Sequence, residues 1–179
     1  VAGSVKVKDF SIDKLKMHLE SDKATVIGIL PDSVVTKKKV IKINRGEDGD
    51  FKFDKNIDVA KVAVVERHQM TGNVATALIE GYGIKTGAIA VTVAHDSHNI
   101  IVVGTNNEDM AFAVSKLIEL EGGIVVVDGG EVLESMPLPI AGLMSDKSGE
   151  WVRDKLTQIH NIAYDRLKAV SYTHLTLPT

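Results

Sequence analysis

The sequence contains no cysteine. This excludes a disulfide framework and a thiolate metal site, and it favours a cytoplasmic protein. No apolar run approaches the ~18–20 residues that a membrane span needs. No signal-peptide pattern opens the chain, which begins with Val1. We therefore expect a soluble protein with no membrane partner.

An excess of positive charge is also missing. The chain has 21 Lys and Arg against 24 Asp and Glu, a net charge of -3, and its basic tract is limited to Lys37-Lys38-Lys39. We therefore expect no nucleic-acid partner, because simple phosphate attraction needs a basic surface. Neither G-x-G-x-x-G nor G-x-x-x-x-G-K-[ST] occurs, so the sequence offers no phosphate cradle of these types.

What is present fits one globular domain. The 179 residues are 44% hydrophobic and 25% charged, which is ordinary for a chain that buries a single core. We expect this domain to span 1–170. The last nine residues, SYTHLTLPT (171–179), carry no Lys, Arg, Asp or Glu, and we interpret them as a non-native tail such as a cloning scar.

Hydrophobic periodicity predicts both strands and helices. Strands are expected at 24–30, 34–44, 59–67, 87–94 and 100–104, with a hairpin at 123–137 around Asp128-Gly129-Gly130. Helices are expected at 9–20, 71–83, 106–120 and 149–170, and a loop at 45–56. Hairpin-length connections outnumber crossovers, so we predict an α+β fold. Its sheet should be mainly antiparallel or mixed, with three to four helices packed on it.

One turn between two predicted strands contains an unusual number of side chains that can bind a ligand or a metal. Within TVAHDSHNIIVVGT (92–105), the turn contains His95, Asp96, Ser97, His98 and Asn99. Neutral imidazole ligates zinc, manganese or iron, which makes His95 and His98 candidate ligands. A metal site also needs a third and usually a fourth ligand. Asp, Ser and Asn are ordinary turn residues as well, so metal ligation, contact with a ligand or partner domain, and plain turn structure all remain open.

Two other segments accompany this turn. The strand at 59–67 ends in Glu66, Arg67 and His68, and residues two apart point the same way from a pleated strand. These side chains could join the histidine turn or form an ordinary surface pair. The apolar segment MPLPIAGLMSD (136–146) could pack in the core or form a docking surface.

Taken in order, ERH, TGN, AHDSHNIIVVGT, GGIVVVDGGEVL and PLPIAGLMS within residues 62–146 point to one family. This stretch closely resembles the C-terminal domain of bacterial and archaeal adenine deaminases of the amidohydrolase superfamily. Residues 1–61 agree with that domain in pattern only, and 171–179 depart from it. The resemblance implies a parent hydrolase that converts adenine and water to hypoxanthine and ammonia. It also implies a divalent metal (manganese, iron or zinc) held in a (β/α)₈ barrel.

The barrel itself is not expected in this chain. A barrel needs ~250 residues, and no two of the six histidines have the H-x-H spacing of the superfamily's ligand pair. We therefore expect a domain with no cofactor of its own, inactive alone. Its partners would be the catalytic barrel domain of the same enzyme, adenine as substrate of the full enzyme, and further copies in a homo-oligomer.

The resemblance also suggests a role for the polar residues. We expect Glu66, Arg67, His68 and the turn from His95 to Asn99 to face the active site and help to enclose adenine, with no individual catalytic role assigned. Two alternatives remain. One is a domain-docking or oligomerisation module with no active-site role, using 136–144. The other is an independent metal-binding protein built on His95 and His98.

Overall fold

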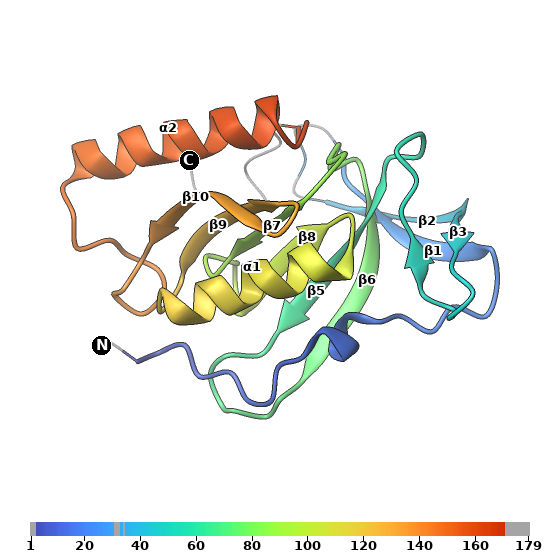
Figure 1. Ribbon diagram of the computed structural model, residues 1–179, viewed down its shortest axis with the longest axis horizontal. Coiled ribbons are helices and arrows are strands. Elements are labelled where there is room, and N and C mark those ends of the chain that lie inside the picture. Colours follow the sequence, from blue (N-terminus) through green and yellow to red (C-terminus); the bar gives the residue numbers. More distant parts are fainter. Residues whose placement is uncertain (1–2, 31–32, 34, 171–179) are drawn as a thin grey trace.

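A computed structural model describes residues 3–30, 33 and 35–170. Its centre is an eight-stranded sheet in the order β10-β9-β7-β8-β5-β6-β1-β2 (Figure 1). The strands are β1 (Lys23–Gly28), β2 (Lys37–Lys42), β5 (Val59–Val65), β6 (Val74–Glu80), β7 (Ala88–Val91), β8 (Ile100–Gly104), β9 (Gly123–Asp128) and β10 (Glu131–Pro137). A separate two-stranded sheet joins β3 (Asn44–Arg45) to β4 (Phe51–Lys52).

The two α-helices cover opposite faces of the sheet (Figure 1). Helix α1 (Asn107–Glu119) packs against β7, β8 and β9, whereas α2 (Gly149–Asp165) packs against β9 and β10. In β9, Val125 and Val127 belong to the core on the α1 side, while Ile124 and Val126 belong to the core on the α2 side. Successive side chains of a strand point to opposite faces, so a strand covered on both faces is apolar throughout.

The predicted class is confirmed. The fold is α+β with a mixed sheet in which β1 pairs parallel with β6 and the other neighbours pair antiparallel. Helix α1 begins after Asn106, whose side chain accepts from the Asp109 N–H, and α2 begins after Ser148, which accepts from the Trp151 N–H. The hairpin around Asp128-Gly129-Gly130 is also confirmed, joining β9 to β10. Helix α2 ends at Asp165 rather than at 170.

The helix expected at 71–83 is wrong, because Val74–Glu80 is strand β6. It pairs with β5 on one side, where Val62 faces Ala77, and with β1 on the other. Leu78 is buried in a small core with Val26 and Val59. The stripe of Val74, Ala77 and Leu78 fits a helix, but pairing on both sides of β6 overrides local helix propensity.

The helix expected at 9–20 is also wrong, since the structure has only a short 3-10 helix at Ile12–Leu15. Beyond it, backbone N–H groups bind outside the segment: Met17 donates to Asp50 Oδ1 and Leu19 donates to the Gly49 carbonyl. Within the described part of the chain there are thus two α-helices, fewer than expected. The loop predicted at 45–56 contains β4 and part of β3.

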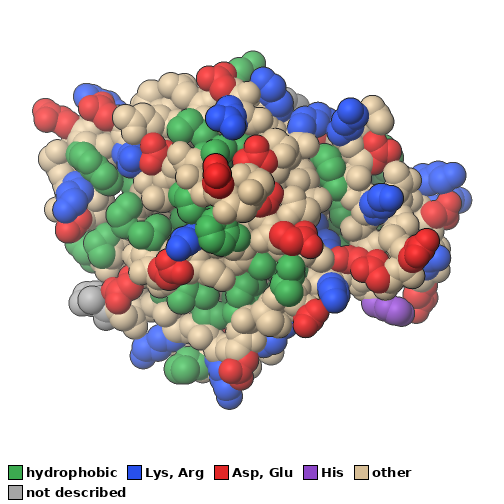
Figure 2. All heavy atoms as spheres, viewed as in Figure 1, with side chains coloured by type: hydrophobic (Ala, Val, Ile, Leu, Met, Phe, Trp, Pro, Cys, Tyr) green, Lys and Arg blue, Asp and Glu red, His purple; other side chains and the backbone are tan. Residues whose placement is uncertain are grey.

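The surface has no extended patch of one charge on the side that carries α1. Figure 2 shows acidic and basic side chains interspersed over this face, between scattered hydrophobic ones. No helix within residues 3–30, 33 and 35–170 has the length and apolar character needed to cross a membrane. Residue 34 of the second predicted strand and the whole segment 171–179 lie outside the described residues.

Candidate functional site

Four connections gather at one end of the sheet, which we call the loop end. They are the β5–β6 hairpin (66–73), the β7–β8 hairpin (92–99), the α1–β9 junction (120–122) and the segment 138–148 that leads to α2. Strand pairing brings them together, because Val65 pairs with both Val74 and Ile100, and Val91 pairs with Ile124. The loop end therefore contains every candidate residue that the sequence singled out.

The β7–β8 hairpin places its polar residues at different depths. His95, Asp96 and Ser97 are exposed, whereas His98 and Asn99 are half-buried. The His98 N–H donates to the Ala94 carbonyl at 2.6 Å, which closes the turn. The rings of His95 and His98 meet edge to face, with centroids 5.5 Å apart. The two imidazoles thus lie next to each other at the end of the sheet.

Arg67 lies beneath this hairpin and is only 1% exposed. Its Nε donates to the His98 carbonyl, and its Nη2 donates to the Ala141 carbonyl at 3.1 Å. Burial lowers the pKa of the guanidinium, but an arginine side chain stays charged in proteins. No carboxylate among the described residues forms an ion pair with it. Arg67 therefore connects the β7–β8 hairpin to the segment 138–148 as a buried cation held by carbonyl oxygens.

Glu66 and His68 have different surroundings although they are two residues apart. The Glu66 carboxylate accepts from the backbone N–H groups of Gln69 and Thr71 at 2.7 and 2.9 Å, and also from the His68 N–H and the Thr71 hydroxyl. These hydrogen bonds lower the pKa of Glu66 to about 2. His68 instead reaches the β7–β8 hairpin, with Nε2 2.9 Å from the Ser97 carbonyl. Arg67 and His68 thus contact the histidine turn, whereas the Glu66 carboxylate stabilises its own hairpin.

Two buried polar atoms of the β7–β8 hairpin have no hydrogen-bond partner within the described residues, His98 Nδ1 and Asn99 Oδ1. A buried polar atom without a hydrogen-bond partner destabilises the folded state by ~1–3 kcal/mol. Such atoms are therefore uncommon in folded proteins. Their position beside the exposed His95 and Ser97 leaves hydrogen-bonding capacity at the loop end.

The loop end does not fit a metal. Among residues 3–30, 33 and 35–170 there is no group of three or more His, Cys, Asp or Glu side chains that could hold an ion. His95 and His98 alone fall short of the three or four protein ligands that zinc takes. The divalent metal implied by the resemblance therefore finds no donor set in the described part of this chain.

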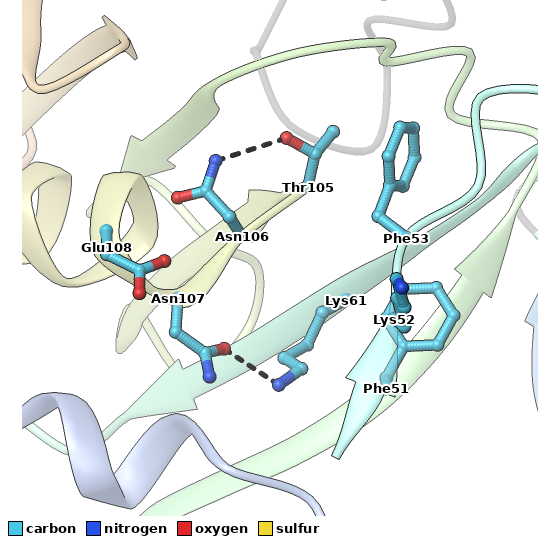
Figure 3. A pocket seen from close by; sticks show the side chains of 8 residues that line it. All are labelled: Phe51, Lys52, Phe53, Lys61, Thr105, Asn106, Asn107 and Glu108. Atoms are coloured by element: carbon cyan, nitrogen blue, oxygen red, sulfur yellow. Dashed lines mark hydrogen bonds between the residues drawn. The ribbon is translucent and has the colours of Figure 1, made fainter. Parts of the chain in front are cut away.

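A second polar cluster, missed by the sequence interpretation, lies near the start of α1 (Figure 3). Lys61 of β5 is only 3% exposed, and its Nζ donates to Asp50 at 2.7 Å, to Asn107 at 2.8 Å and to the Leu15 carbonyl at 2.9 Å. Burial lowers the pKa of Lys61, although Asp50 opposes the shift. Burial alone would raise the pKa of Asp50, but the hydrogen bonds from Lys61, the Met17 N–H and Asn107 outweigh it and lower that pKa.

The Lys61 cluster is a structural anchor. A pocket of about 220 Å³ opens beside it, lined by Phe51, Lys52, Phe53, Lys61, Thr105, Asn106, Asn107 and Glu108. The three ammonium protons of Lys61 match its three partners, so none remains for a ligand in the pocket. The Lys61–Asp50 ion pair, together with Asn107, instead connects β5, α1 and the segment before β4. The signal for it was a single lysine within the apolar run VAKVAVV (59–65).

Together, the fold and the loop end define a class of protein. The chain is an α+β domain with a mixed sheet covered on both faces by helices, and its polar residues gather at one end without a metal-binding set among the described residues.

Comparison with known proteins identifies the family. The family model described as "Adenine deaminase C-terminal domain" matches residues 33–178. The chain is 62% identical over 165 residues to adenine deaminase 2 of Desulfotalea psychrophila, covering 92% of this chain and 29% of that relative. It is 49% identical to adenine deaminase of Ligilactobacillus salivarius, covering 84% of this chain and 26% of that protein. The chain therefore belongs to the adenine deaminase C-terminal domain family, and it spans less than a third of the length of these relatives.

Proposed function

We propose that this domain works within an adenine deaminase, which hydrolyses adenine to hypoxanthine and ammonia, and that its loop end closes the active site of the catalytic domain. Family membership supports the reaction. The observation that carries the role of the loop end is the contact of Arg67 with the His98 carbonyl, which fixes a hairpin whose His95, Asp96 and Ser97 remain exposed.

The chemistry of these exposed groups suits adenine. The purine offers ring nitrogens as acceptors and an exocyclic amine as donor, and imidazole, carboxylate and hydroxyl groups complement them. Excluding water from a site strengthens the electrostatic interactions inside it. The domain would thus contribute enclosure and positioning, while proton transfer and water activation belong to the catalytic domain.

Further features of the parent enzyme follow from the family resemblance. The proposal includes membership of the amidohydrolase superfamily, a role in purine salvage and a cytoplasmic location. It also includes a catalytic barrel with manganese, iron or zinc, a homo-oligomeric assembly, and a chain that has no deaminase activity by itself. The isolated chain should therefore release no ammonia from adenine, with or without added divalent metal.

The decisive test replaces His95 and His98 by alanine, singly and together, in the full-length parent enzyme. Because displaced or missing positioning groups can cost about 100-fold in rate, we expect kcat/KM for ammonia release to fall by about 10-fold or more. His18→Ala is the matched control, since His18 is an exposed histidine close to Gly49 and away from the loop end. Turnover within about twofold of wild type in the double variant would contradict the enclosure role and favour a docking module.

A further inference from the structure

An apolar pocket lies at the loop end, between the segment 138–148 and α2. It measures about 240 Å³, and its apolar lining includes Val93, Leu143, Met144, Val152 and Leu156. Met144 is 58% exposed at this site. Within the segment predicted either to pack in the core or to form a docking surface, Met136 and Leu138 are buried while Met144 is exposed.

The size and chemistry of this pocket suit a protein side chain. Small-molecule sites usually occupy ~300–1,000 Å³ and combine apolar walls with several convergent polar groups. This pocket is smaller, and its polar lining residues are only Ser145 and Lys147 among the described residues. An exposed apolar depression of this kind is typical of a contact with another protein surface.

The course of the N-terminal segment indicates which surface that is. The Gly3 N–H donates to Glu121 Oε2 at 3.0 Å, and the Lys6 N–H donates to the Arg67 carbonyl at 2.9 Å. Figure 1 shows that the blue N-terminal segment, described from residue 3 onward, begins on the same side of the molecule as the orange segment 138–148. The family is a C-terminal domain by description, and 29% coverage of the Desulfotalea relative leaves most of that protein outside it. A domain that precedes this one would therefore join the chain beside the loop end.

The pocket and the histidine turn are close neighbours. Val93 lies in the connection that carries the turn, and Gly142 lies against Arg67, where an added Cβ would be 2.9 Å from Nη1. The buried His98 Nδ1 and Asn99 Oδ1, which have no hydrogen-bond partner among the described residues, belong to the same turn. A covering protein would bury the apolar pocket and contact the exposed His95, Asp96 and Ser97 together.

From these observations we infer that the preceding catalytic domain of the same polypeptide docks on the loop end and inserts an apolar side chain into the pocket around Met144. This inference rests on the proposed function for the identity of the partner. The inference goes beyond that function because it identifies the surface through which the two domains bind each other.

The test is Met144→Asp in the full-length parent enzyme, with Val40→Asp as the matched control. Val40 is 67% exposed on strand β2, at the far edge of the sheet. A carboxylate buried without a partner is strongly unfavourable, so Met144→Asp should raise the fraction of undocked enzyme about 10-fold or more. Limited proteolysis between the domains measures this fraction, because cleavage of a transiently opened state follows its population. Unfolding of the isolated chain should be unchanged by either substitution.

Three results would overturn the inference. The first is cleavage of the Met144→Asp enzyme at the wild-type rate. The second is an equal acceleration by Val40→Asp. The third is an isolated chain that sediments as a dimer disrupted by Met144→Asp, since a second copy would then occupy the pocket. The enclosure role is judged separately by the alanine variants of His95 and His98, so either idea can fail while the other stands.

Discussion

Lys61 offers the sharpest test of how this fold is stabilised. Replacing it by methionine keeps most of the side-chain volume but removes the ammonium group that binds Asp50, Asn107 and the Leu15 carbonyl. Asp50 would remain as a carboxylate that is only 7% exposed. Removing one partner of a buried ion pair destabilises a protein by ~3–5 kcal/mol, because the other charge stays buried.

The expected loss lies near the lower end of that range. Asp50 keeps hydrogen bonds from the Met17 N–H at 2.8 Å, the Phe51 N–H at 2.7 Å and Asn107 at 2.7 Å. These donors compensate part of the lost charge, so we expect Lys61→Met to lower the free energy of unfolding by ~3 kcal/mol. For a domain of this size, that loss corresponds to a fall in Tm of ~6–12 °C.

Urea unfolding of the isolated chain measures the effect. Lys52→Met is the matched control, because Lys52 lines the same pocket but is exposed, and it should change stability by less than ~0.5 kcal/mol. The double variant Lys61→Met/Asp50→Asn should lose less than the sum of the two single losses, since the unpaired carboxylate is gone. A loss below ~1 kcal/mol for Lys61→Met would refute the view that this ion pair is a structural anchor.

Two further predictions concern Glu66 and Gly142 of the loop end. The pKa of Glu66 lies at about 2, below its ordinary 4.5, so its stabilising effect is present above the ordinary value and disappears as the pH falls toward 2. Urea unfolding between pH 5 and 2 should show a weaker pH dependence for Glu66→Gln, and curves parallel to wild type would contradict this origin of the shift. Gly142→Ala should lower Tm more than Gly129→Ala. Both glycines have positive φ, 69° and 60°, but only the added Cβ at 142 meets Arg67. Equal losses would show that Arg67 does not restrict this position.

The loop end was largely predictable because local signals and global pairing agreed there. Apolar runs on each side of His95 to Asn99 became β7 and β8 as expected, and the Asp-Gly-Gly turn placed β9 against β10. The sequence left open whether Arg67 and His68 join the histidine turn, and both contact it in the structure. The structure of a segment can be predicted from sequence when its hydrophobic pattern, its turn residues and its strand pairing agree in this way.

The errors fell where contacts distant in sequence decide the structure. Ala77 and Leu78 favour a helix, but β6 lies between two partner strands. The N–H of Met17 finds Asp50, far along the chain, in place of a helical carbonyl. The burial of Lys61 and Arg67 was not predictable for the same reason. Lys61 contacts Leu15 and Asp50, and Arg67 contacts the carbonyls of His98 and Ala141, so distant parts of the chain cover both side chains.

The pairing of β5 with β8 has a consequence for how the loop end arises. Val65 pairs with Ile100 although strands β6 and β7 lie between them in the sequence. This pairing brings Arg67 within reach of His98. Contacts of long sequence separation form only after the intervening chain has been closed into a loop, which slows folding. A short peptide with the sequence of the histidine turn would lack Arg67, which holds the His98 carbonyl. Grafting residues 95–99 alone onto another scaffold would therefore not reproduce the conformation of the turn.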